Sequence, residues 1–429
     1  MTNLTPASRQ SLPGPDDISR IQLPNGIVIL SRANVQSPSV VLSGYLGAGS
    51  VYDPPQKLGL AYFTALALMR GTERFTFSEI FDRLESAGAS LGFGASVHNT
   101  SFGGRALSED LPLLFEMLSE TLRRPTFPEL YVERLRAQIL TGLAIRNQDT
   151  ADMASLEFDR LVFPGHPYGQ PEDGYPETIR SISRADLVDY HHRHYGPQDM
   201  VITVVGAVTP EQVLEEATRT FGDWENPNPN SLPALPVITS PAETIRRHIN
   251  IPGKFQTDLM IGSLGPCRNS PDYLPASLGN SVLGQFGMMG RIGEAVREKS
   301  GLAYYASTSL NAWILSGSWE VTAGVNPANV QRAVELIVSE LQRFTREPVS
   351  LEELQDSQSN FVGRLPLALE SNGGVANALL NLERFNLGLD YYLRYADLIN
   401  SITPDMALET ARRHLDPEKL IIVSAGTEG

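Results

Sequence analysis

The residues with the clearest capacity for chemistry in this 429-residue chain are Arg297 and Tyr304, seven positions apart. They lie in RIGEAVREKSGLAY (291–304), which is typical of a helix running into a strand. A guanidinium stays charged and offers forked donors that suit a peptide carbonyl, while a phenol donates a single hydrogen bond. Tyr305 would point to the opposite face of such a strand, because successive strand residues alternate. The alternative is purely structural: Arg297 pairs with a carboxylate such as Glu294, and Tyr304 packs.

Other catalytic groupings are absent from the sequence pattern. No Ser-His-Asp or Cys-His arrangement stands out, and the scattered carboxylates suggest no acid–base pair. His191, His192 and His194 cluster in one predicted helix, where an i,i+3 pair such as His191 and His194 can bind a metal. Charged histidines near a helix C-terminus also interact favourably with the helix dipole, so this cluster needs no metal.

A second segment, GLAYFTALALMRGT (59–72), is informative for the chemistry that it lacks. It closely resembles the zinc-site helix of the pitrilysin/insulinase family of metallopeptidases, which usually reads GLAHFLEHMLFKGT. In those enzymes the HxxEH spacing places two histidines one turn apart, and the glutamate between them polarises the zinc-bound water. The corresponding residues here are Tyr62, Ala65 and Leu66. Tyrosine is at most a weak zinc ligand, and alanine and leucine neither bind metal nor move a proton.

The third zinc ligand of that family is a glutamate on a later helix, and Gly142 stands at its position. Tyr62, Ala65, Leu66 and Gly142 therefore cannot supply the zinc ligands and the catalytic glutamate of that family. The resemblance implies that this chain holds no catalytic zinc and no cofactor of its own, and that zinc belongs to a partner subunit.

The segment 291–304 resembles the family sequence RxxxEVREKRGLAYS. In the family this arginine and tyrosine face the zinc across the cleft, hold the substrate backbone and stabilise the oxyanion formed during hydrolysis. The resemblance thus implies catalytic roles for Arg297 and Tyr304. Just upstream, LGQFGMMGR (283–291) corresponds to a segment that the family often writes LGGGFSSRL. Its residues Gly284, Phe286 and Gly287 are expected either to contact substrate or simply to form a tight turn.

Bulk properties exclude several classes of protein. An apolar content of 41% and a charged content of 19% are typical of a soluble globular protein. A formal charge of −15 argues against a nucleic-acid partner, because phosphates would be repelled. No run approaches the ~18 apolar residues that a membrane span requires. The single Cys267 fits a reducing compartment, and a cytoplasmic location is expected.

The sequence repeats itself. Residues 182–206 (ISRADLVDYHHRHYGPQDMVITVVG) align without a gap with residues 402–426 (ITPDMALETARRHLDPEKLIIVSAG). Both copies predict a helix, a proline turn and a short apolar strand. A duplication of this length indicates two tandem domains of similar fold.

The domain boundaries follow from composition. Residues 1–19 are polar and rich in Pro and Ser, which predicts a disordered lead-in rather than a signal peptide. An N-terminal domain with the degenerate zinc positions is expected at 20–222, and a Pro/Asn-rich linker at 223–242. The C-terminal domain, 243–429, carries the Arg/Tyr pair.

The order of elements predicts an α+β fold in each domain. Paired strands are expected at 27–31 and 40–47, a hairpin at 89–107, and helices at about 109–123, 128–147 and 152–163. Segregated strands and helices favour an antiparallel sheet covered by helices on one face. The resemblance adds that two such domains, or two chains, close like a clamshell around a peptide.

The resemblance extends from about residue 20 to residue 427. In some bacterial members of the family, and similarly in the mitochondrial processing peptidase subunits, one chain keeps HxxEH and its partner keeps the Arg/Tyr pair. We therefore expect a non-zinc subunit of a heterodimeric zinc-dependent endopeptidase, with an HxxEH-bearing paralogous subunit and peptides as partners. It would be inactive alone. The alternatives are an inert scaffold, as in the respiratory ubiquinol–cytochrome c reductase complex, and a peptide-binding homodimer.

Overall fold

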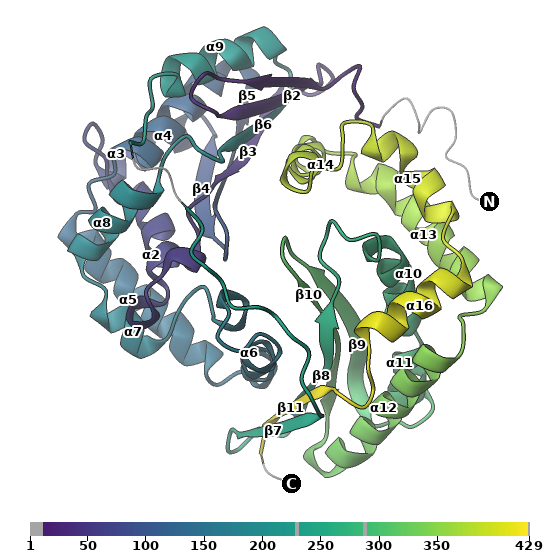
Figure 1. Ribbon diagram of the computed structural model, residues 1–429. Coiled ribbons are helices and arrows are strands. Elements are labelled where there is room, and N and C mark those ends of the chain that lie inside the picture. The colour runs from purple at the N-terminus through teal and green to yellow at the C-terminus, as the bar shows by residue number, and fades with distance from the viewer. Residues whose placement is uncertain (1–11, 228–230, 286–289, 428–429) are drawn as a thin grey trace.

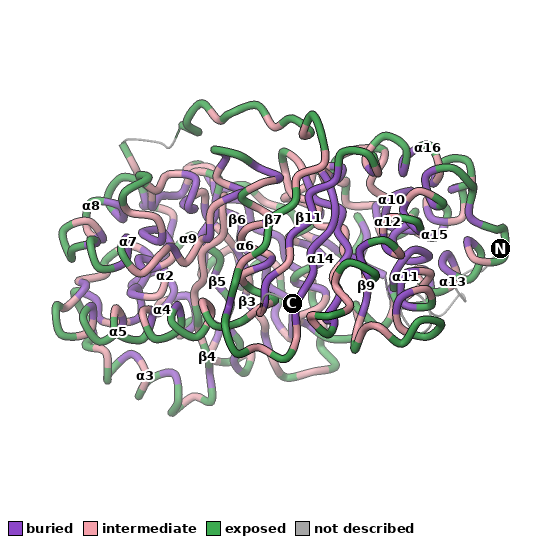
Figure 2. Tube along the Cα trace, turned by 90° about the horizontal axis from the view of Figure 1, so that it is seen from below, coloured by how far each residue is buried: buried purple, intermediate pink, exposed green. Residues whose placement is uncertain are grey.

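The chain folds into two halves of similar architecture, as the computed structural model in Figure 1 shows. The structure describes residues 12–227, 231–285 and 290–427. Helices form the outside of each half, and the sheets lie toward the middle, where the buried residues concentrate in Figure 2. No helix in the described ranges is long and apolar enough to cross a bilayer. The expected fold of two similar α+β domains is confirmed.

The first sheet has six strands in the order β1-β2-β6-β3-β5-β4. The expected direct pairing of 27–31 with 40–47 is wrong, because β6 lies between β2 and β3, parallel to the former and antiparallel to the latter. All six residues of β6 are buried, so this strand needs a central place with both faces covered. The strands are β1 Ser19–Gln22, β2 Val28–Ala33, β3 Ser39–Leu46, β4 Ser90–Ala95, β5 Thr100–Leu107 and β6 Val201–Gly206.

Several helices of the first half begin at capping boxes. Thr76, Ser183 and Thr209 each accept a hydrogen bond from the backbone N–H three residues on, and the side chain there bonds back. The following residue starts α3, α8 or α9. The helices are α2 Leu60–Ala67, α3 Phe77–Ser86, α4 Leu111–Arg123, α5 Glu129–Arg146, α6 Thr150–Val162, α7 Pro176–Ser181, α8 Arg184–His194 and α9 Pro210–Phe221.

The second sheet has five strands in the order β7-β11-β8-β10-β9, again with one parallel pair, β7 and β11. Residues 223–227 and 231–244 join the halves without a helix or strand. The strands are β7 Ile245–Asn250, β8 Thr257–Gly265, β9 Ala303–Ala312, β10 Gly317–Val325 and β11 Ile421–Gly426. The helices are α10 Tyr273–Gly284, α11 Gly290–Gly293, the π-helix η6 Glu294–Glu298, α12 Val330–Arg346, α13 Leu351–Ala368, α14 Asn372–Arg384, α15 Tyr391–Asn400 and α16 Pro404–His414.

The sequence repeat is also a structural repeat. Helix α8 and strand β6 reappear 220 positions later, with the same bounds at both ends, as α16 and β11. Strand β11 lies between β7 and β8 just as β6 lies between β2 and β3. Gly206 and Gly426 end the two strands at φ 155° and 156°, where a Cβ atom would come within 2.3 Å of the Ser39 carbonyl oxygen or 2.5 Å of Thr257 Oγ1. Only glycine fits at these two equivalent positions.

The two halves exchange one helix each. Helix α6 of the first half packs on β8 and β11 of the second sheet, and α14 of the second half packs on β3 and β6 of the first. Each sheet therefore has its own helices on one face and a helix from the other half on the opposite face. The buried apolar residues at the α14 interface include Leu30, Val201, Val205, Val375, Leu379 and Leu382, and those at the α6 interface include Phe158, Val162, Met260, Ile421 and Val423.

Part of the expected lead-in is packed on this junction. Leu12 is 4% exposed and Ile18 is 6% exposed, and Ile18 belongs to the same apolar cluster as α14. The prediction of disorder is therefore wrong for residues 12–18, because the apolar side chains of Leu12 and Ile18 in this polar stretch are buried. Residues 1–11 lie outside the described part of the chain.

Hydrogen bonds also join the halves. Asp258, buried at the start of β8, accepts hydrogen bonds from Tyr305 Oη at 2.5 Å, from Gln256 Nε2 at 2.9 Å and from the hydroxyl of Thr150. Thr150 is the first residue of α6, so its bond fixes the start of the exchanged helix to the second sheet. Three donors satisfy this buried carboxylate.

A second carboxylate at the junction, that of Asp159 on α6, has no ion-pair partner among the described residues. Burial, and then the neighbouring charges of Glu320 and Glu172, raise the pKa of Asp159 to about 8. Between about pH 4 and pH 8, the Asp159 carboxyl group is therefore protonated in the folded chain and deprotonated in the unfolded chain. The contribution of Asp159 to stability is therefore fully present below about pH 4 and is lost as the pH rises toward 8.

Leu379→Ala should lower the free energy of unfolding by about 2–5 kcal/mol, because it opens a cavity between α14 and the first sheet. Leu367→Ala, at a leucine that is 66% exposed, should change it by less than about 0.5 kcal/mol. Urea unfolding followed by tryptophan fluorescence and by circular dichroism checks this, and both probes should report one shared transition. Separate unfolding transitions for the two halves would contradict the claim that the exchanged helices α6 and α14 make the two halves unfold together.

Asp159→Asn should stabilise the protein more at pH 8 than at pH 5, by at least about 1 kcal/mol, since the charged form is the one that burial penalises. Urea unfolding at the two pH values measures the difference. Asp356→Asn, at an exposed position on α13, is the matched control. An equal effect of Asp159→Asn at both pH values would show that the folded protein does not raise this pKa.

Candidate functional site

Helix α2, which carries three of the four degenerate zinc positions, is firmly held at its start. Gly59 precedes it at φ 93°, a conformation that favours glycine. The half-buried carboxylate of Asp53 accepts hydrogen bonds from the backbone N–H groups of Gly59 and Ala61, both at 2.9 Å. Burial raises the pKa of Asp53 to about 7, although these donors favour its charged form. The helix framework of the resembled motif is therefore intact.

The four degenerate positions lie on two helices that pack against each other, α2 and α5. Tyr62 and Leu66 are half-buried, Ala65 is fully buried, and Gly142 is exposed on α5. A Cβ atom at Gly142 would meet nothing within 4 Å, so packing does not require glycine there. Together the four residues offer one phenol and no other group that could bind a metal.

An ion pair lies beside Tyr62. Arg146, one turn beyond Gly142 on α5, donates to the carboxylate of Asp173 and, at 3.1 Å, to the carbonyl oxygen of Gly174. Burial, followed by the negative charge of Asp173, raises the pKa of Tyr62. A phenol that is kept neutral in this way is a poor zinc ligand.

The histidines of α8 have structural contacts. His191 is buried, and its Nε2 lies 2.7 Å from the carbonyl oxygen of Leu122. Burial lowers the pKa of His191 to about 4, so the ring is neutral near pH 7. His194 stacks on Tyr52 with ring centroids 4.5 Å apart. In the described ranges no group of three or more His, Cys, Asp or Glu side chains is arranged to hold a metal ion.

Arg297 and Tyr304 lie on either side of a tight connection from η6 to β9. Gly301, at φ 64°, makes the turn between them. The Tyr304 side chain projects outward, with the residue 74% exposed, while Tyr305 points to the other face and bonds to Asp258. Arg297 is half-buried, and its Nε lies 3.6 Å from Glu298 Oε1. One part of the structural alternative holds, because Arg297 pairs with a nearby carboxylate, that of Glu298; Glu294 bonds to Lys299 instead. The other part does not, because Tyr304 is exposed rather than packed.

Strand β9 forms one edge of the second sheet. It pairs with β10 on one side, and on the other side with no strand of the described chain. Unpaired N–H and C=O groups along an edge can accept another extended chain. Tyr304 therefore stands at an edge where a peptide could add to the sheet.

A partly buried ion pair, which the sequence analysis did not single out, holds the helical segment that carries Arg297. The Nε and Nη2 atoms of Arg291 donate to the two carboxylate oxygens of Glu353, each at 2.7 Å, and Nη1 lies 3.9 Å from Glu340. The hydrogen bonds from Arg291 are the main cause that lowers the pKa of Glu353 to about 2. This two-point bond fixes the start of the segment that leads through η6 to β9.

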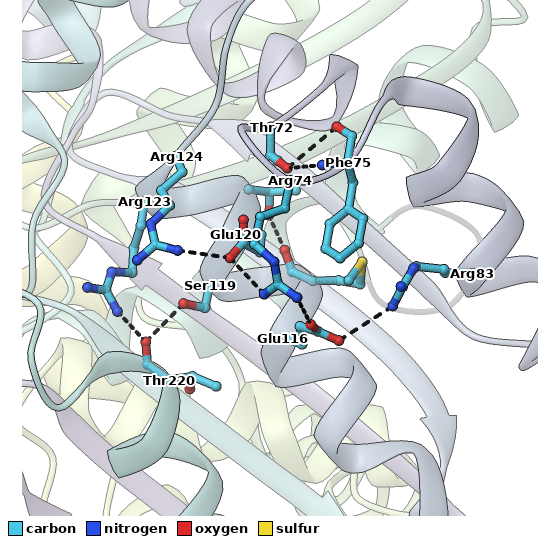
Figure 3. Close-up of polar contacts among 12 residues, drawn as sticks. Thr72, Arg74, Phe75, Arg83, Glu116, Ser119, Glu120, Arg123, Arg124 and Thr220 are labelled. Carbon is cyan, nitrogen blue, oxygen red and sulfur yellow. Dashed lines mark hydrogen bonds and ion pairs between the residues drawn. The ribbon is translucent and has the colours of Figure 1, made fainter.

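The first half contains a matching arrangement on α4, shown in Figure 3. Glu120, at the position equivalent to Glu340, lies 3.2 Å from both Arg74 and Arg124, and Arg74 also bonds to Glu116 at 2.9 Å. Arg74 belongs to the loop before α3, so the buried glutamate anchors that loop to α4. The recurrence of Ser-Glu at 119–120 and 339–340 was the sequence signal that could have pointed to the two equivalent buried glutamates, Glu120 and Glu340.

The glycine segment is placed only in part. Gly284 is buried as the last residue of α10, where a Cβ atom would lie 2.5 Å from side-chain atoms of Thr308 on β9. Its glycine is thus explained by close packing against β9. Phe286 and Gly287 lie outside the described residues, and their contact with substrate stays a prediction.

Comparison with known proteins agrees with this geometry. Residues 28–160 match the family Insulinase (Peptidase family M16), and residues 181–361 match the Peptidase M16 inactive domain. A protein of Streptomyces coelicolor called an uncharacterized zinc protease is 23% identical over 401 residues, covering 92% of this chain and 86% of that one. Subunit 1 of the mitochondrial cytochrome b-c1 complex of Bos taurus is 27% identical over 267 residues, covering 62% of this chain and 55% of that subunit.

Solved structures show the same fold. A crystal structure described as a peptidase M16 inactive domain from Pseudomonas fluorescens matches with a TM-score of 0.89 and 25% identity, covering 96% of this chain and 98% of that one. A protease from Helicobacter pylori matches with a TM-score of 0.88 at 18% identity, covering 97% and 100%. With matches to this family over residues 28–160 and 181–361, this chain belongs to peptidase family M16, the insulinase family, and residues 181–361 are of the inactive-domain type.

Proposed function

We propose that this chain is the non-zinc subunit of a two-chain, zinc-dependent cytoplasmic endopeptidase. Its partner is a paralogous chain with an HxxEH helix and the downstream glutamate, and its substrates are peptides enclosed between the two chains. One observation carries the proposal: Arg297 and Tyr304 flank the start of the open edge strand β9, in a chain whose zinc positions offer no ligand set.

The chemistry of Arg297 and Tyr304 suits an active site that is divided between two chains. Zinc in the partner would polarise the scissile carbonyl and supply the attacking water. In this chain, Arg297 can give forked donors to the peptide backbone, and Tyr304 can donate one hydrogen bond to the developing oxyanion. The free edge of β9 can bind the peptide as an added strand. The Arg291–Glu353 bond keeps these groups in place between turnovers.

A second candidate is a scaffold without proteolysis. The similarity to a subunit of the cytochrome b-c1 complex favours it, since that name describes a component of a larger assembly. Under this function Arg297 and Tyr304 are unused, and the surfaces between chains matter. A peptide-binding homodimer is the third candidate, and it would need no HxxEH partner.

Hydrolysis of a quenched-fluorescence peptide library should occur only when this chain is mixed with an M16 paralogue of the same genome that keeps HxxEH. Arg297→Ala should lower the rate of the mixture by at least about 10²-fold, and Tyr304→Phe should lower it similarly, because both remove a donor to the transition state. Arg332→Ala is the matched control, since Arg332 is an exposed arginine of the same half that pairs only locally with Glu335. A mixture in which Arg297→Ala and Tyr304→Phe cleave normally would support the scaffold instead.

This chain alone should retain less than about 0.1 zinc per molecule after dialysis against zinc and then buffer, because Tyr62, Ala65, Leu66 and Gly142 cannot form a ligand set. The partner alone should retain about one. Inductively coupled plasma mass spectrometry of both proteins measures this. Stoichiometric zinc in this chain, together with peptidase activity in the absence of a partner, would contradict the proposed division.

A further inference from the structure

A groove of about 530 Å³ lies within the second half, and none of the positions discussed for peptide hydrolysis lines it. The loop from β8 into α10 forms one wall, the connection between α14 and α15 forms the other, and α15 and α16 complete the lining. Pockets that bind small molecules are commonly of this size and mostly apolar, with few polar groups. The apolar lining includes Leu274, Pro275, Leu387, Leu398, Ile402 and Met406.

Arg268 gives the groove its positive charge. This residue is half-buried, and its guanidinium carbon lies 4.0 Å from the centre of the Tyr273 ring, 5.3 Å from that of Phe385 and 5.8 Å from that of Tyr391. Its Nη2 donates a long hydrogen bond, 3.5 Å, to the Tyr391 hydroxyl. The side-chain atoms Nε and Nη1 have no hydrogen-bond partner among the described residues, and neither atom is fully buried. Both can therefore meet a ligand.

The carboxylates nearest to this arginine in the two walls are bound elsewhere. Asp272 accepts two hydrogen bonds from Arg413, at 2.6 and 3.0 Å. Asp390 accepts two from Arg394, at 2.7 and 3.1 Å, and so neutralises the other cation that lines the groove. Within the described ranges no Asp or Glu lines the groove, and Arg268 forms no ion pair. In a chain with a formal charge of −15, this guanidinium is an uncompensated cation.

Backbone hydrogen bonds fix both walls of the groove. The backbone N–H of Arg268 donates to the carbonyl oxygen of Trp313 at 2.9 Å. In the opposite wall, α14 ends in a Schellman turn: Asn386 has φ 49°, and the N–H of Leu387 donates to the carbonyl oxygen of Leu382 at 3.0 Å. The walls are thus formed before any ligand binds, which lowers the entropic cost of binding.

We propose that this groove binds a small monocarboxylic acid with an apolar body, either an aryl-alkyl acid or a medium-chain fatty acid. The ligand carboxylate would accept hydrogen bonds from the Arg268 guanidinium, and the apolar body would lie against Leu387, Leu398 and Met406. A single uncompensated guanidinium in an apolar groove favours an anion over a neutral or cationic molecule of the same shape. This site goes beyond the proposed peptidase function and does not rest on it.

The first test is isothermal titration calorimetry of the full chain with 4-phenylbutyrate, octanoate, 4-phenylbutan-1-ol and 4-phenylbutylamine. At least one of the two acids should bind with a Kd below about 1 mM. The alcohol should bind about 10-fold or more weakly than 4-phenylbutyrate or octanoate, whichever binds better, and the amine should not bind, because only a carboxylate pairs with the guanidinium. The better acid shows whether the natural ligand has an aromatic or an aliphatic body. The proposal is overturned if neither acid binds at concentrations on the order of 10 mM, or if the alcohol binds as tightly as the better acid.

Variants then locate the site. In Arg268→Gln, the better acid and the alcohol should bind equally, whereas Arg332→Gln, at an exposed arginine that pairs locally with Glu335, should leave their difference unchanged. Met406 is 40% exposed, so it tolerates polar substitutions. Met406→Glu should weaken binding of the acid by at least about threefold relative to Met406→Gln, because it adds a negative charge to the groove. This matched pair decides the location even if Arg268→Gln does not fold. An unchanged preference for the acid in Arg268→Gln, or equal binding by the two Met406 variants, would overturn the proposal.

Discussion

The packing of α6 and α14 across the two halves is the contact on which the rest of this structure depends. A sheet with both faces apolar cannot leave one of them in water, and here the second face of each sheet is covered by a helix from the opposite half. Neither half can close its core alone. The arrangement also brings charged groups of distant sequence together, because Asp159 lies on α6 and Arg384 ends α14.

Fold and chemistry are separable in the first half. Helix α2 is held in place because Phe63 and Ala67 are fully buried in the first core and Asp53 holds its start. Zinc chemistry would require different side chains at only a few positions, and at Gly142 a Cβ atom would meet nothing within 4 Å. The second half differs, since Arg291 and Glu353 form a partly buried ion pair that positions the helical segment leading to β9 and its exposed Tyr304.

Much of the fold could be predicted because local patterns and tertiary structure agree. The repeat placed α8 with β6 and α16 with β11, and the predicted helices near 109–123, 128–147 and 152–163 are α4, α5 and α6. Tyr305 was expected to face away from Tyr304, and the alternation of β9 gives that result. The four degenerate positions could be found only through their resemblance to a motif, since Tyr62 or Gly142 alone carries no signal.

Other features could not be predicted because they depend on long-range partners. The apolar faces of α6 and α14 would suit any sheet, and nothing in Val375 or Leu379 indicates that their sheet belongs to the other half. Strands that are adjacent in sequence were expected to pair, but β6 lies between β2 and β3 and pairs with both. Burial of Ile18 depends on an apolar surface that includes residues of α14.

The most direct test of the central claim is a structure of this chain with its HxxEH partner, made inactive by replacing the motif glutamate, and a bound peptide. The account predicts that the peptide lies along the free edge of β9. Its scissile carbonyl should then lie between the partner's zinc and the side chains of Arg297 and Tyr304, within hydrogen-bond distance of at least one of them, about 3 Å. A complex in which the peptide binds elsewhere, or in which Arg297 and Tyr304 face solvent away from the zinc, would contradict it.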